Sequence, residues 1–287
     1  MNSYRIITDS CCDFTDAQYL HYNVHPVKLT VLWQGREHRN FSEDTQLHEF
    51  YESMRRGATA TTSAVNPEEW KAAMEEALKQ NQDVLCLTFS SALSTTSQSA
   101  CIAAAELREG YPQRNIRVVD TLCAALGQGL LLVNACRKRD EGMELDALAD
   151  WVEEEKAHLA HWVTVDDLDH LKRGGRISAA TAFVGGMLNI KPIIHMDDEG
   201  KLATTGKCRG RKAAMEHLVA RFLEDCTDPE TIAIAHGDCP EDAAQLEALL
   251  RSKCPGIREV ITGYVGGVIG AHTGPGVLVV FFRGKKR

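Results

Sequence analysis

Residues 84–98 read Val84-Leu85-Cys86-Leu87-Thr88-Phe89-Ser90-Ser91-Ala92-Leu93-Ser94-Thr95-Thr96-Ser97-Gln98. The first six are almost wholly apolar, which is typical of a strand buried in a parallel sheet. The remainder is rich in hydroxyl groups and leads into residues 99–107, a run of good helix formers. A strand, a polar turn and a helix in this order predict an α/β unit.

The turn between this strand and this helix is a candidate anion site. The first N–H groups of a helix have no intrahelical partner, and the helix dipole favours negative charge there. Ser94, Thr95 and Thr96 can add side-chain donors, and no Lys or Arg lies within the turn. Neutral donors suit a small anion such as a carboxylate. Simple N-capping of the helix by Ser and Thr is the alternative interpretation.

Length and composition predict a globular protein of two domains. The chain has 287 residues, of which 44% are hydrophobic and 25% charged, and roughly 150 residues per domain gives two domains. A net charge of −8 argues against nucleic acid as a general partner. No apolar run reaches about 18 residues, so we expect no transmembrane segment. Transient contact with a membrane surface is compatible with this composition.

The ten cysteines predict a reducing environment. They are scattered, several lie within apolar runs, and none forms a Cys-x-x-Cys pair or a zinc-type spacing. The N-terminus leads directly into a strand-like run, without the pattern of a signal peptide. We therefore expect a cytoplasmic protein with reduced packing cysteines, no metal site and no cofactor.

Strand-like and helical runs alternate along the first half of the chain. Strands are predicted at 4–8, 24–33, 84–89 and 115–120, and helices from residue 15 and at 43–56, 67–79, 99–107 and 123–139. This alternation predicts a parallel sheet with helices on both faces, a three-layer α/β/α domain. Polar turns at Asp9-Ser10, Ser90–Thr96 and Asp120-Thr121 then meet at one edge of the sheet, where ligands bind in open α/β folds. Residues 59–67 are expected to form a hydroxyl-rich loop that ends at the N-cap Asn66.

The second half predicts a different domain. We place the boundary after an acidic helical run, which gives domains 1–158 and 159–287. Strand patterns at 161–165, 202–207, 231–236, 258–262 and 277–282, with helices at 209–223 and 241–250, predict a two-layer α/β domain with a mixed sheet of about six strands. Residues 183–194 are expected to form domain core or the wall of an apolar tunnel, and residues 263–276 a glycine-rich bend.

Further polar candidates lie in this second half. His272 sits among glycines that allow close approach to a ligand, so its imidazole could meet a carboxylate or a phosphate; a structural histidine is the alternative. Two basic clusters, which contain Arg173 with Arg176 and Arg209 with Arg211, could hold an anionic head group or an acidic partner, or could be solvated turns. The common phosphate-loop, nucleophile-elbow and zinc-protease motifs do not occur in the sequence, which argues against a nucleotide-using or hydrolytic enzyme.

Together these segments resemble the DegV family of bacterial fatty-acid-binding proteins over the whole chain. The resemblance is carried, in order, by residues 7–10, 62–69, 90–100, 120–129, 166–177 with 188–193, and 270–276. Each segment is a weak signal by itself, and the combination is specific.

The resemblance implies a non-enzymatic protein that binds a long-chain fatty acid between two domains. By this resemblance Thr62 and Ser94 hold the carboxylate, with Ser63 and Thr95 nearby. It also places His272, and Arg173 or Arg176, close to the head group. Some relatives are the acyl-binding subunit of a bacterial fatty acid kinase and present the carboxylate to a separate ATP-using subunit, which implies such a partner here.

The chain departs from the family pattern near the head group. Ala92 and Thr95 stand where the family usually has glycine, Cys11-Cys12 where it has Ser or Thr, and Ser97 where an aromatic residue is common. One alternative function is a stand-alone small-molecule kinase or hydrolase that uses Asp9, Asp120 and His272. Another is a carrier for a different apolar acid with another tail length.

Overall fold

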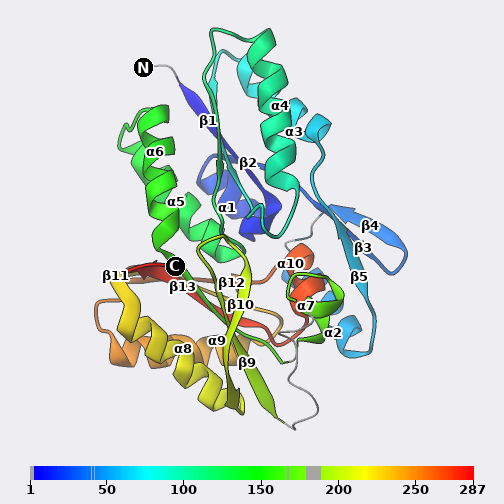
Figure 1. Ribbon diagram of the computed structural model, residues 1–287, viewed down its shortest axis with the longest axis vertical. Helices are drawn as coiled ribbons and strands as arrows, with labels where there is room; N and C mark the ends of the chain where they lie inside the picture. The colour runs from blue at the N-terminus through cyan, green and yellow to red at the C-terminus, as the bar shows by residue number, and fades with distance from the viewer. Residues whose placement is uncertain (1–2, 40, 42, 167, 179–188) are drawn as a thin grey trace.

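Three β-sheets organise the part of the chain that the structure describes (Figure 1). The computed structural model describes residues 3–39, 41, 43–166, 168–178 and 189–287. The first sheet has four parallel strands in the order β2–β1–β6–β7. They are β1 (Tyr4–Asp9), β2 (Val24–Val27), β6 (Asp83–Thr88) and β7 (Ile116–Asp120). All six residues of β6 are buried, because helices cover both faces of the sheet.

Helices lie on the two faces of this parallel sheet, as the alternating pattern predicts (Figure 1). The helices α3 (Pro67–Lys79) and α4 (Thr96–Gly110) lie on one face, and α5 (Leu126–Asp140) and α6 (Leu145–Glu155) on the other. The capping box predicted at Asn66 is present at the start of α3. Two further helices, α1 (Asp16–His21) and α2 (Asp44–Arg55), precede α3.

The second sheet has six strands of mixed direction, in the order β10–β9–β8–β13–β11–β12. They are β8 (Leu159–Thr164), β9 (Ile190–Met196), β10 (Leu202–Arg209), β11 (Cys226–His236), β12 (Glu259–Tyr264) and β13 (Leu278–Gly284). The helices α8 (Arg211–Asp225) and α9 (Pro240–Lys253) cover one face. The mixed sheet of about six strands is therefore confirmed, and the boundary between residues 158 and 159 is kept as our proposal.

Helix α5 covers the other face of the six-stranded sheet as well as its own sheet. It contacts β8, β11 and β13, and every residue from Leu126 to Val133 is buried. A helix that is apolar on all sides has to be enclosed on all sides. The two halves of the molecule therefore share this helix as a common core element.

A small antiparallel sheet, β4–β3–β5, projects from the first half. It contains β3 (Thr30–Trp33), β4 (Arg36–Arg39) and β5 (Ala60–Ser63). The prediction of one strand over 24–33 is wrong, because β2 ends at Val27 and the Leu29 N–H bonds to the Ser10 hydroxyl at a corner. The loop predicted at 59–67 is also wrong in its first part, because β5 pairs with β3 there.

A helix lies inside the segment predicted as a glycine-rich bend. Residues Gly267–Thr273 form α10, so the bend is confined to the flanking residues. The glycines allow close packing: a Cβ at Gly270 would clash with the Tyr51 hydroxyl, and one at Gly267 with the Phe41 ring. Of the segment predicted as core or tunnel wall, residues 183–188 lie outside the described part. Within the described ranges, no helix is both long and apolar enough to cross a membrane.

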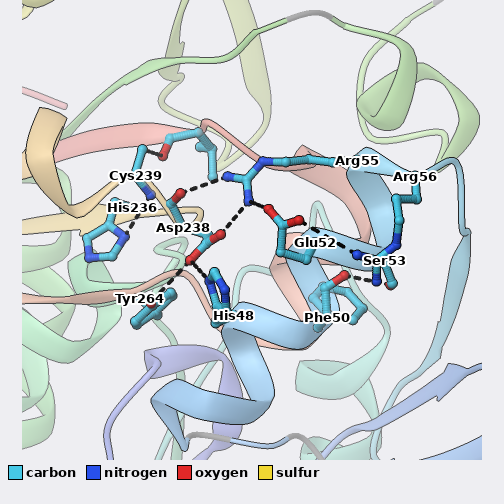
Figure 2. A network of polar contacts seen from close by, with 11 residues as sticks. His48, Phe50, Glu52, Ser53, Arg55, Arg56, His236, Asp238, Cys239 and Tyr264 are labelled. Atoms are coloured by element: carbon cyan, nitrogen blue, oxygen red, sulfur yellow. Dashed lines mark hydrogen bonds and ion pairs between the residues drawn. The ribbon is translucent and has the colours of Figure 1, made fainter.

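One polar network joins the two halves at the turn between β11 and α9 (Figure 2). Asp238, in a left-handed conformation with φ 56°, has a side chain that is only 5% exposed. Its carboxylate bonds to His48 Nδ1 at 2.8 Å, accepts from the Tyr264 hydroxyl at 3.2 Å and pairs with Arg55. Arg55 also donates to the Asp238 carbonyl at 2.7 Å. The network therefore fixes the end of α2 against the second half of the chain.

Replacement of Arg55 by Ala is expected to lower the free energy of unfolding by about 2 kcal/mol, because the Asp238 carboxylate stays buried after losing a charged partner. Arg56 is the matched control. Its side chain is 68% exposed and its ion pair with Glu52 is 3.8 Å long, so Arg56→Ala should change stability by less than about 0.5 kcal/mol. Urea unfolding measures both, and equal effects of the two variants would contradict the assigned role of the network.

Candidate functional site

A cavity of about 520 Å³ lies between the two halves of the molecule. Most of its wall is apolar and comes from both halves, including Leu29, Phe89, Ile194, Val265, Val279 and Phe281. The polar side chains in the wall include Thr62, Ser91, Ser94, Thr95, Arg176 and His272. A largely apolar cavity of roughly 300–1,000 Å³ with a few polar groups is the usual form of a small-molecule site.

Thr62 and His272 meet at this cavity from different elements. Thr62 lies on β5 and His272 on α10, and the Thr62 hydroxyl is 2.9 Å from His272 Nε2. Burial, and secondarily the Arg176 charge, lower the pKa of His272 to about 4. The imidazole is therefore neutral at pH 7. In the tautomer with a proton on Nε2 it donates to Thr62 and leaves the hydroxyl hydrogen of Thr62 for a ligand.

Ser94 and Thr95 lie at the start of α4, as predicted. Ser94 Oγ is 3.0 Å from Thr96 Oγ1 and accepts from the Thr96 N–H at 3.3 Å. Thr95 is the N-cap residue, but its side chain makes no capping hydrogen bond and is exposed. N-capping by Thr95 therefore does not explain the hydroxyl groups of this turn.

Arg176 is a cationic side chain in the wall of the cavity that these hydroxyl groups line. Its guanidinium donates to the Leu93 carbonyl at 3.1 Å and to the Gly174 carbonyl. Gly174 packs against the His272 ring so closely that a Cβ would clash with Nδ1. Arg176 therefore links Leu93, which precedes Ser94, to Gly174, which packs against His272. This arrangement brings the predicted site residues Ser94, Arg176 and His272 together.

Four predicted residues lie elsewhere. Ser63 is exposed and, by strand alternation, faces away from the cavity that its neighbour Thr62 lines. Arg173 ends the short helix α7 (Asp169–Arg173) and is exposed, as is Arg209 on β10. Arg211 is half-buried and donates to Asp242 at 2.8 Å, which is a structural role at the start of α8.

Asp9 and Asp120 both accept backbone hydrogen bonds at the carboxyl edge of the parallel sheet. Asp9 accepts from the Phe89 and Cys11 N–H groups, and Asp120 from those of Ser91 and Leu122. The predicted meeting of these turns at one edge is confirmed. Within the described ranges, no hydrogen bond joins Asp9, Asp120 and His272 to one another, and no cluster of three acidic, His or Cys side chains could hold a metal ion.

His161 is a cavity residue that sequence reasoning missed. It is buried on β8, its Nδ1 bonds to the Leu159 carbonyl at 2.9 Å, and its Nε2 accepts from the Ala124 N–H at 3.2 Å. Burial, with a smaller effect of Arg287, lowers its pKa to about 3. The sequence feature that could have identified this residue is a single His inside an otherwise apolar strand. This imidazole is neutral and both of its nitrogens are hydrogen-bonded, so it forms part of the cavity wall.

Acid should therefore destabilise the protein partly through His161. Between about pH 6.5 and pH 3 the unfolded chain binds a proton at this imidazole and the folded protein does not, so stability falls as pH falls. From pH 7 to pH 4.5 we expect the wild type to lose about 2 kcal/mol more than His161→Gln. Urea unfolding at both pH values measures this. The half-buried His158, changed to Gln, is the control outside the cavity wall and should keep the wild-type difference. A His161→Gln protein that also keeps it would refute the assignment.

The fold and the cavity define a two-domain α/β protein with a largely apolar cavity between its halves. A family model described as "Uncharacterised protein, DegV family" matches residues 3–285. A DegV domain-containing protein of Clostridium perfringens is 41% identical over 287 residues, which cover 99% of this chain and 98% of that protein. The chain therefore belongs to the DegV family.

Solved structures of relatives share the whole fold. A DegV family protein from Thermus thermophilus, described for its fatty acid binding, is 32% identical with a TM-score of 0.88 over 98% of this chain and 99% of that one. Bacillus subtilis DegV, described as a fatty acid binding protein, is 30% identical with a TM-score of 0.85 over 99% and 100%. A stearic acid-binding protein from Eubacterium ventriosum is 25% identical with a TM-score of 0.85 over 98% of each chain.

Proposed function

We propose that this protein binds a long-chain fatty acid in the cavity between its halves and acts as a carrier rather than as an enzyme. The observation that carries the proposal is the cavity itself, which combines an apolar wall from both halves with the paired Thr62 and His272 and the nearby Ser94. The described fatty acid binding of the Thermus thermophilus and Bacillus subtilis relatives supports it.

The carboxylate in this proposal bonds to the hydroxyls of Thr62 and Ser94. Neutral His272 donates to Thr62 and so orients the hydroxyl hydrogen toward the carboxylate. Thr95 is exposed beside Ser94 and lines the same cavity, so it can add a donor where the site opens. Arg176 contributes long-range attraction while its hydrogen bonds go to carbonyl groups. Ser63 has no part in the site, because it faces away.

The acyl tail in this proposal supplies most of the affinity. Each methylene removed from water contributes about 0.8 kcal/mol, so a tail of ~14 methylenes gives on the order of 10 kcal/mol before the costs of ordering the ligand are subtracted. The head-group contacts then set orientation more than affinity. Such a division suits a carrier, because the carboxylate stays chemically accessible while the tail is held.

We further propose that the protein presents this carboxylate, in the cytoplasm, to a separate ATP-dependent fatty acid kinase subunit. The exposed cations Arg173 and Arg209 suit an acidic surface on such a partner. The hydrogen bonds of Asp9 and Asp120 to backbone groups argue against the stand-alone kinase or hydrolase. Turnover of ATP by the isolated protein would favour that alternative instead.

Replacement of both Thr62 and Ser94 by Ala should weaken palmitate binding by about 30-fold or more, because each hydroxyl makes a hydrogen bond of roughly 1.5–3 kcal/mol with a charged group. Isothermal titration calorimetry on delipidated protein measures this. Ser63→Ala is the matched control, adjacent in sequence but on the opposite face of β5, and should bind as the wild type does. Unchanged affinity in the double variant would contradict the carboxylate assignment.

A further inference from the structure

Two carboxylates hold the backbone where β6 ends. Strand β6 lies between β1 and β7, and each neighbour ends in an aspartate, Asp9 or Asp120. Asp9 Oδ2 accepts from the Phe89 N–H at 2.6 Å, and the Asp120 oxygens accept from the Ser91 N–H at 3.2 and 3.3 Å. The chain leaving β6 is thus held from both sides just before the turn that carries Ser94.

Asp9 is the more enclosed of the two aspartates, with 0% of its surface exposed. Its Oδ1 accepts from the Cys11 N–H at 3.0 Å and lies 3.5 Å from Gln128 Nε2 on α5. One carboxylate therefore joins its own turn, the end of β6 and the helix shared by both halves. Hydrogen bonds from N–H groups to an ionised carboxylate are stronger than those to a neutral acceptor.

The turn from Ser90 to Ser94, which follows Phe89 directly, is closed by its own backbone hydrogen bonds. The Ser90 carbonyl accepts from the Leu93 and Ser94 N–H groups at 3.0 and 3.1 Å. The Ser90 hydroxyl donates to the Gly200 carbonyl at 2.8 Å, and Arg176 holds the Leu93 carbonyl. The two bonds of the Ser90 carbonyl close the turn on itself, so the position of the backbone at Phe89 and Ser90 helps to set the position of Ser94.

We propose that Asp9 is a positioning residue of the head-group site: its ionised carboxylate, by holding the Phe89 N–H, sets the path of the turn that presents Ser94. The inference rests on the proposed function for its effect on fatty acid binding, whereas the hold on Phe89 can be tested without any ligand.

The buried surroundings of Asp9 shift its pKa toward neutral pH, so its charge can change within the pH range of an experiment. Burial raises the pKa of Asp9 to about 6, while the hydrogen bonds from Phe89, Cys11 and Gln128 act in the opposite direction. The titratable groups that face it are the thiols of Cys11, Cys12 and Cys86, the Tyr19 phenol and Asp13. Burial raises the pKa of each of these, and the thiols and the phenol, whose ordinary pKa values already lie above 8, stay protonated between pH 5 and pH 8 while Asp9 titrates.

Asparagine cannot replace Asp9 in this role. Two oxygens of Asp9 accept from N–H groups of two different segments. In Asp9→Asn one of these oxygens becomes an NH₂ group that faces an N–H donor, so one hydrogen bond is lost and the two donors repel each other. Thr8→Val is the matched control, because Thr8 is equally buried and bonds to the Leu87 carbonyl and Gln128 but not to Phe89.

The first measurement is palmitate affinity at pH 7.5 by isothermal titration calorimetry. Asp9→Asn is expected to bind about 10-fold more weakly than the wild type, and Thr8→Val within about 2-fold of it. Equal affinity of Asp9→Asn and the wild type, or an equal loss in both variants, would overturn the proposal.

The second measurement needs no variant and no ligand. In the delipidated wild type the Phe89 amide proton shift, followed by NMR from pH 5 to pH 8, is expected to titrate with a midpoint near that of Asp9. The Ser91 amide, which bonds to Asp120 instead, is expected to show the same titration with a smaller amplitude. A Phe89 shift that stays flat over the pH range in which the Asp9 carboxyl carbon itself titrates would overturn the proposal even if Asp9→Asn fails to fold. A wild type that binds no palmitate would refute the proposed function and leave this titration as the test of Asp9.

Discussion

The burial of α5 between two sheets is the constraint on which the rest of the structure depends. This helix is enclosed from Leu126 to Val133 and packs on the parallel sheet with one side and on β8, β11 and β13 with another. Apolar surface on all sides cannot be left in water, so the two halves have to close around it. The residues just before it, Ala124 and Ala125, line the cavity.

The polar part of the cavity consists mainly of neutral donors. Thr62 and His272 form a neutral pair, and Arg176 directs its hydrogen bonds to carbonyl groups. A bidentate ion pair would bind a carboxylate more strongly and would also cover both of its oxygens. In the proposed function, neutral hydroxyl donors hold the carboxylate less strongly than such an ion pair would, which suits its presentation to another protein. The described features of the site therefore agree with the proposed carrier role better than with catalysis by this chain.

Much of the parallel sheet could be predicted from the sequence, because its elements are locally consistent. The strand and hydroxyl-rich turn of residues 84–98 carry their own signals, and the meeting of Asp9 with the end of β6 follows from strand direction alone. The six-stranded mixed sheet followed from its alternating strand runs.

Elements that depend on distant partners could not be predicted in this way. Strand β5 has a loop-like composition and exists because Thr62 pairs with Val31 of β3. Helix α10 is rich in glycine, which disfavours helices, and forms where Gly270 packs against Tyr51. Both elements carry residues of the proposed head-group site, so the contact between Thr62 and His272 could not be predicted from local sequence, although the resemblance to the family named both residues.

Mass spectrometry of lipid extracted from the purified protein, without prior delipidation, tests the central claim most directly. We expect a fatty acid of about 14 to 18 carbons in a one-to-one ratio with protein. Burial of ~14 methylenes in an apolar cavity should keep the fatty acid bound during purification. A protein that carries no fatty acid, and that also takes up none when palmitate is added, would contradict the account.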